Sequence, residues 1–172
     1  PAESAWPVAP WAVNLVTHST SPRLASDLEQ VAKHQPPIVI TALGSPKPVI
    51  PVVHSYGGLV FADVTSVELA RKAADAGVDG LVLVCSGAGG HTGELSPLVF
   101  AERVRQFFNG YIALAGAINT GEAVLAAQVL GADFGYVGTA FIPATESLAS
   151  DEYRQMLTEC GPTDLMVTKA FT

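Results

Sequence analysis

The sequence predicts an α/β fold in which helices cover a parallel β-sheet, and three observations support this. Short segments rich in Val, Ile and Leu alternate with segments whose apolar residues recur at helical spacing. One strand and one helix together occupy about 25 to 30 residues, the size of a βα unit. The 172 residues, 49% of them hydrophobic and 15% charged, suffice to bury a core. We expect one domain over residues 1–172.

Six segments have the composition of buried strands and are bounded by Gly, Pro, Asn or Asp. They are residues 10–16, 38–43, 59–64, 79–85, 111–115 and 134–137. Residues 165–167 are a further strand candidate. Together the segments predict a sheet of at least six strands.

The segments between these strands are predicted to be helical, over residues 23–34, 49–55, 67–76, 97–108, 121–130 and 150–159. Ser66, Ser96 and Thr120 are expected N-caps, and Pro97 follows one of them at a position that favours proline. Gly77 and Gly131 are expected to end two helices. The alternation fits either a doubly wound open sheet or part of a TIM barrel, which needs eight units and ~250 residues.

The charge distribution excludes several kinds of partner. The net charge is −7 and Lys and Arg form no cluster, so neither nucleic acid nor an anionic membrane is an expected partner. No apolar stretch approaches the roughly 20 residues of a membrane span, and no secretory signal is evident. Two cysteines form neither a disulfide framework nor a zinc pattern. We expect a cytoplasmic protein and no metal site; a homodimer is left open.

The segment 80–94 combines a buried strand with a glycine-rich loop that contains His91. Glycine permits positive φ and lets a ligand approach the main chain. An imidazole is suited to proton transfer near neutral pH. Because parallel α/β folds carry their chemistry at the carboxyl ends of the strands, His91 is the candidate catalytic residue; the alternative is a surface turn.

The next two strands end in small residues, Gly116–Ala117 and Gly138–Thr139. Such turns expose backbone N–H groups, and neighbouring strand ends of this kind commonly hold a phosphate in a barrel. The alternative is tight turns without a ligand. No dinucleotide fingerprint or P-loop is present. A histidine and a phosphate site without a nucleophile imply that a cofactor supplies the chemistry.

Two polar residues near strand ends are further candidates. Asn14 lies within an apolar segment, where it either satisfies backbone groups or faces a ligand. Asp63 either meets a ligand or caps the helix that begins at Ser66. Glu94 either orients His91 or belongs to the solvated loop. Among the other histidines, His18 could face the same rim, whereas His34 and His54 are expected to be structural or solvated.

Three segments together resemble the nitronate monooxygenase family, formerly called 2-nitropropane dioxygenases. They are residues 88–93 (Ala-Gly-Gly-His-Thr-Gly), residues 114–118, and residues 131–141 with their Gly-Thr-Ala-Phe end. The resemblance extends from Trp11 to about Phe171. It implies a TIM (β/α)8 barrel with non-covalent FMN, of which this chain covers about six strands. Since family members are longer at both ends, we expect part of a longer protein and unpaired strands at the barrel's edges.

The resemblance also implies roles for individual residues. His91 matches the family's catalytic base, which acts on a nitroalkane or nitronate substrate that is oxidised with O2 to a carbonyl compound and nitrite. The residues that match FMN-binding positions are Asn14, Asp63, Gly89, Gly90, Gly116, Ala117, Gly138 and Thr139.

Two positions depart from the family pattern. Asp63 stands where better-studied members carry a lysine, and Ala117 where many carry glycine. Two other functions stay open. One is a flavin-dependent enoyl-thioester reductase, which would require NAD(P)H. The other is an inactive module that binds a phosphate ligand.

Overall fold

The computed structural model describes residues 9–169. The chain divides into two compact units, the first ending at Tyr136 and the second beginning at Val137. Each unit is described by itself. No helix within residues 9–169 is long and apolar enough to cross a membrane.

The first unit contains a parallel sheet of six strands, paired in chain order. The strands are β1 Ala12–Val16, β2 Ile38–Ala42, β3 Leu59–Val64, β4 Gly80–Val84, β5 Tyr111–Ala115 and β6 Phe134–Tyr136. The pairing places Asp63 of β3 opposite Val82 of β4, and Ala115 of β5 opposite Tyr136 of β6. All six predicted strands are therefore present, each within two residues of its predicted ends.

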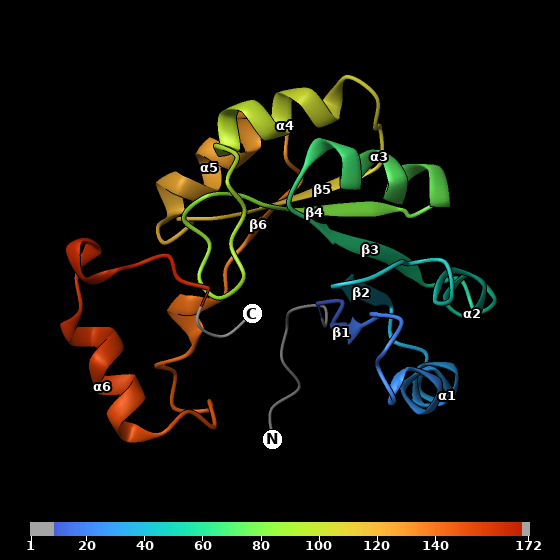
Figure 1. Ribbon diagram of the computed structural model, residues 1–172, viewed down its shortest axis with the longest axis horizontal. Helices are drawn as coiled ribbons and strands as arrows, with labels where there is room; N and C mark the ends of the chain where they lie inside the picture. Colours follow the sequence, from blue (N-terminus) through green and yellow to red (C-terminus); the bar gives the residue numbers. More distant parts are fainter. Residues whose placement is uncertain (1–8, 170–172) are drawn as a thin grey trace. The chain divides into compact units, whose positions relative to one another are not determined.

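A helix follows each of the first five strands and lies on the outer side of the curved sheet (Figure 1). The helices are α1 Leu24–His34, α2 Ile50–His54, α3 Val67–Ala76, α4 Pro97–Arg105 and α5 Gly121–Val129. The predicted caps are confirmed at Ser66 and Thr120, whose hydroxyl groups accept hydrogen bonds from backbone N–H groups. Ser96 occupies the N-cap position without a side-chain bond. This strand–helix alternation is the architecture of a (β/α)8 barrel, represented here by six strands.

The two faces of the sheet differ because successive side chains point in opposite directions. The helix-covered face carries residues that are at most 1% exposed, among them Val39, Leu81, Leu83, Ile112 and Leu114. We call the opposite side the inner face. Its residues alternate with these along each strand: Ala12, Asn14, Val16, Ile38, Ile40, Ala42, Leu59, Phe61, Asp63, Gly80, Val82, Val84, Tyr111, Ala113, Ala115, Phe134 and Tyr136.

The amino ends of the strands are closed on the inner face by aromatic rings. Phe61 stacks on Tyr111 with ring centroids 6.0 Å apart, and Phe134 lies 6.5 Å from Phe61 and 6.0 Å from Tyr111. Gly80 makes room for this packing, since a Cβ there would lie 2.5 Å from the Phe61 ring. The aromatic rings fill the inner face at the amino ends of the strands. The carboxyl ends therefore remain as the place where a ligand can bind.

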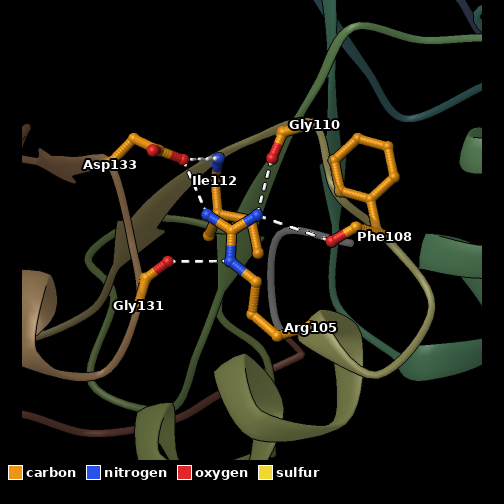
Figure 2. A network of polar contacts seen from close by, with 6 residues as sticks. All are labelled: Arg105, Phe108, Gly110, Ile112, Gly131 and Asp133. Atoms are coloured by element: carbon orange, nitrogen blue, oxygen red, sulfur yellow. Dashed lines mark hydrogen bonds and ion pairs between the residues drawn. The ribbon is translucent and has the colours of Figure 1, made fainter.

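Two aspartates hold neighbouring strands together at the amino end. Asp133 Oδ2 accepts a hydrogen bond of 2.8 Å from the Ile112 N–H (Figure 2). The same oxygen forms an ion pair with Arg105 Nη2 at 2.7 Å. Asp79 Oδ2 accepts equivalent bonds of 2.8 Å from the Val60 N–H and from His54 Nε2. Both aspartates follow a Gly-x pair that ends a helix, so the same short motif is used twice. The prediction that His54 is structural or solvated is confirmed, because the residue is exposed and bonds to Asp79.

The second unit contains η1 Thr139–Phe141, α6 Asp151–Glu159 and η2 Pro162–Asp164. Ser150 caps α6 by accepting a hydrogen bond from the Tyr153 N–H, and Arg154 bonds to the Ser147 carbonyl. The prediction of a strand at residues 165–167 is wrong: these residues are 79–87% exposed and pair with no strand in the described part of the chain. Three apolar residues do not form a strand without a neighbour.

Candidate active site

The loop that carries His91 folds back over the end of β4. The Ser86 N–H donates to the Leu95 carbonyl at 2.9 Å, and Thr92 Oγ1 donates to the Cys85 carbonyl at 3.2 Å. Gly93 is required at this closure, because a Cβ there would lie 2.1 Å from the Val84 carbonyl oxygen. His91 is exposed between Gly90, whose φ is +76°, and Thr92. The loop thus presents the imidazole at the carboxyl edge of the sheet.

This loop is joined to the turn that follows β5. The Ala117 N–H donates to the Gly87 carbonyl at 3.1 Å, and a Cβ at Gly116 would lie 2.9 Å from the Ser86 carbonyl oxygen. Gly116 and Ala117 have φ angles of +126° and +56°. Ala117 holds a conformation that alanine rarely adopts, where glycine would be unstrained. The His91 loop and the first predicted phosphate turn are therefore neighbours, but the Ala117 N–H is occupied.

The second predicted phosphate turn lies in the second unit. Gly138 precedes η1, and its carbonyl accepts a hydrogen bond of 2.9 Å from the Phe141 N–H. A Cβ at Gly138 would meet no atom within 4 Å, so the backbone is open to a ligand at this point. That Gly138 and Thr139 bind one phosphate together with Gly116 and Ala117 stays a prediction.

Asn14 and Asp63 come together on the inner face. A hydrogen bond from the Asn14 side chain reaches the Asp63 carboxyl group, although β2 lies between their two strands. Asp63 Oδ1 is buried and has no hydrogen-bond partner among residues 9–169. Burial raises the pKa of Asp63 from 3.8 to about 6, and the bond from Asn14 opposes this shift. Asp63 does not cap α3, because Ser66 does so with its own hydroxyl.

Tyr136 joins this pair, and the sequence analysis did not identify it. It is the last residue of β6, is 38% exposed, and lies on the inner face two residues after Phe134. Burial raises the pKa of Tyr136, and the charge of Asp63 raises it further. The sequence feature that could have identified Tyr136 is the two-residue period of a strand, which places it on the same face of the sheet as Asp63.

Other candidate groups take no part in this arrangement. Glu94 is exposed on the loop. His18 Nδ1 lies 2.7 Å from Thr20 Oγ1 in the loop after β1. Cys85 is fully buried, and burial raises the pKa of its thiol to about 11, so it is not a nucleophile near neutral pH. Within residues 9–169, no three His, Cys, Asp or Glu side chains are placed to hold a metal ion.

The carboxyl end of the inner face offers polar groups and space to a ligand. Asn14, Asp63 and Tyr136 offer hydrogen-bonding groups, and one oxygen of Asp63 has no partner within the described residues. A Cβ at Gly90 would meet no atom within 4 Å, which leaves space beside the His91 loop. A buried polar atom without a partner is costly, and a ligand that donates a hydrogen bond would relieve this cost.

The parallel strands, the outer helices and the polar groups at the carboxyl edge define the class of the (β/α)8 barrels that bind a ligand at this edge. The family model for nitronate monooxygenase matches residues 8–172, and the chain belongs to this family. The resemblance seen in the sequence is thereby confirmed.

Individual relatives agree with this assignment. A probable nitronate monooxygenase of Staphylococcus aureus is 30% identical over 156 residues, which cover 84% of this chain and 44% of that protein. FabK from Thermotoga maritima is similar in structure, with a TM-score of 0.81 and 28% identity over 88% of this chain and 48% of that one.

A nitroalkane oxidase from Streptomyces ansochromogenes has a TM-score of 0.74 and 28% identity, over 81% of this chain and 43% of that one. The chain therefore spans about half the length of the relatives that it matches.

Proposed function

We propose that this chain is part of an FMN-dependent nitronate monooxygenase. Such an enzyme oxidises a nitroalkane or alkyl nitronate with O2 to a carbonyl compound and nitrite. Besides membership of the family, the main support is that the His91 loop is bonded to the Gly116–Ala117 turn at the next strand end. The loop of the candidate base and the candidate phosphate turn thus lie at neighbouring positions on the edge where barrels carry their chemistry.

In this proposal each residue has a defined task. A ring nitrogen of His91 accepts the proton from the substrate carbon beside the nitro group. Gly89 and Gly90 leave room for the flavin edge, and Asn14 and Asp63 meet its polar groups. Gly116 and Ala117 form one proposed phosphate turn, in which the Ala117 N–H is already bonded to the Gly87 carbonyl. Gly138 and Thr139 are proposed as further phosphate contacts. When bound, FMN supplies the electron transfer from the deprotonated substrate to O2.

The role of His91 is tested by His91→Asn. In the full chain loaded with FMN, we expect nitroalkane turnover, measured as nitrite release, to fall ~10²–10⁴-fold, the usual contribution of a general base. Bound flavin, measured by visible absorbance, should be retained. His34→Asn, at the end of α1, is the matched control and should leave turnover unchanged. Unchanged turnover in His91→Asn would exclude His91 as the base.

The same assays separate the alternatives. NAD(P)H oxidation that requires an enoyl thioester, without nitrite release, would favour the reductase. A purified chain that takes up no added FMN and remains colourless would favour the inactive binding module.

A further inference from the structure

The inner face carries a single charged side chain, that of Asp63. Every other inner-face residue of β1–β6 is apolar except Asn14, Tyr111 and Tyr136, and none of them is a lysine or arginine. Asp63 is the fifth residue of β3, so its carboxyl group lies near the carboxyl end of the strand. Within strands β1–β6, no positively charged side chain balances Asp63 on the side of the sheet where a substrate is expected.

The groups around Asp63 do not neutralise this charge. Asn14 contributes a neutral amide, and Tyr136 lies close enough for the charge of Asp63 to affect its pKa. The neighbouring strands β2 and β4 contribute the apolar residues Ile40, Ala42, Val82 and Val84. The basic residues at the same edge, Lys47 and His91, belong to exposed loops and not to the inner face.

The predicted phosphate turn at Gly116–Ala117 follows β5, which is separated from β3 by β4. An anionic cofactor tail at that turn would therefore be held apart from Asp63. A second anion bound against β3 would instead meet the carboxylate in a partly buried setting, where like charges interact strongly. A neutral molecule bound there would meet no such repulsion.

We propose that Asp63 is a specificity residue that makes the site take a neutral nitroalkane in preference to the anionic nitronate. The proposal rests on the proposed function and names the form of the substrate that this site accepts. In physical terms, the carboxylate repels the anionic nitronate at the inner face, whereas a neutral nitroalkane carries no net charge for it to repel.

The test compares Asp63→Asn with the unmodified chain. Asparagine keeps the shape and removes the charge, while one acceptor oxygen is replaced by an amide NH2 group that donates. With the FMN-loaded chain, kcat/KM is measured for nitroethane and for the ethyl nitronate anion, well above the Asp63 pKa of about 6. We expect the nitronate-to-nitroethane ratio to rise ~10-fold, equivalent to about 1.4 kcal/mol. Asp75→Asn, on the exposed side of α3, removes the same charge elsewhere and should leave the ratio unchanged.

A binding measurement provides a readout that does not depend on turnover. Nitrate, a planar anion that does not react, is titrated into the ¹⁵N-labelled, flavin-free chain, and the amide signals of Asn14 and Asp63 are followed by NMR. We expect the Kd for nitrate to be ~10-fold lower in Asp63→Asn. An unchanged Kd, or no detectable binding to the variant, would overturn the proposal. If neither nitro compound is turned over, the proposed function fails, but the nitrate titration still decides the role of Asp63.

Discussion

At the scale of single residues, the carboxyl group of Asp63 is the polar group whose burial in this site is most costly when it is ionised. One of its oxygens is buried without a hydrogen-bond partner in the part of the chain that the structure describes, and burial raises the pKa of Asp63 from 3.8 to about 6. A raised pKa means that the folded chain binds this proton more tightly than the unfolded chain does. The contribution of Asp63 to stability is therefore fully present below pH 3.8 and is lost as the pH rises through about 6.

Asp63→Asn should consequently stabilise the chain only at higher pH. Well above pH 6 we expect the free energy of unfolding to increase by up to about 3 kcal/mol, and near the unfolded pKa we expect almost no change. Guanidinium unfolding at the two pH values measures both quantities. Asp75→Asn is the control, and equal effects of Asp63→Asn at both pH values would contradict this account.

Among the elements, α4 is joined to its surroundings by buried apolar residues and by a polar network around one side chain. Arg105 Nε donates to the Gly131 carbonyl at 2.8 Å, Nη1 to the Gly110 carbonyl at 2.7 Å, and Nη2 to Asp133 at 2.7 Å (Figure 2). The planar guanidinium group can bond to all three partners at once, which a lysine cannot do. Arg105 thereby joins the end of α4, the start of β5 and the chain that follows α5.

Arg105→Met keeps much of the side-chain length but removes every one of these bonds. We expect the free energy of unfolding to fall by roughly 2 kcal/mol, because polar groups lose their partners and Asp133 loses its cation. Arg103→Met changes the same charge on the exposed side of α4 and should cost under about 0.5 kcal/mol. Chemical denaturation measures both variants, and equal losses would show that the network does not stabilise α4.

The strands were predictable because each is an apolar segment bounded by glycine, proline or a polar residue. The end of α4 was less predictable: the helix ends at Arg105 and not at Phe108. The Arg105 side chain bonds to the Phe108 and Gly110 carbonyls and so holds the chain beyond the helix. A contact of this kind depends on tertiary structure and leaves no periodic signal in the sequence.

The candidate site was predictable to the extent that it depends on strand ends. His91, Gly116 and Ala117 could be assigned because glycine-rich turns follow apolar segments. Two features could not be foreseen: the bond between Asn14 and Asp63 across an intervening strand, and the occupied Ala117 N–H. Both depend on the stagger of strands and on loop contacts, which composition does not encode.

At the scale of the whole molecule, the two units differ in how much they bury. β5 has four buried residues, and α3 buries Ala70 and Ala73. In contrast, none of residues 137–169 is buried, α6 included. Since local stability follows the burial of apolar groups, the second unit should open at a lower free-energy cost than the sheet.

Hydrogen exchange measured by mass spectrometry tests this difference directly. We expect the amides of α6 to exchange at least about 100-fold faster than those of β5, equivalent to about 2.7 kcal/mol of opening free energy. Peptides from α3 are the matched control, because α3 is a helix of similar length that packs on the sheet. They should exchange more slowly than those of α6. If α6 were protected as strongly as α3, the second unit would be stabilised by contacts other than the burial described here.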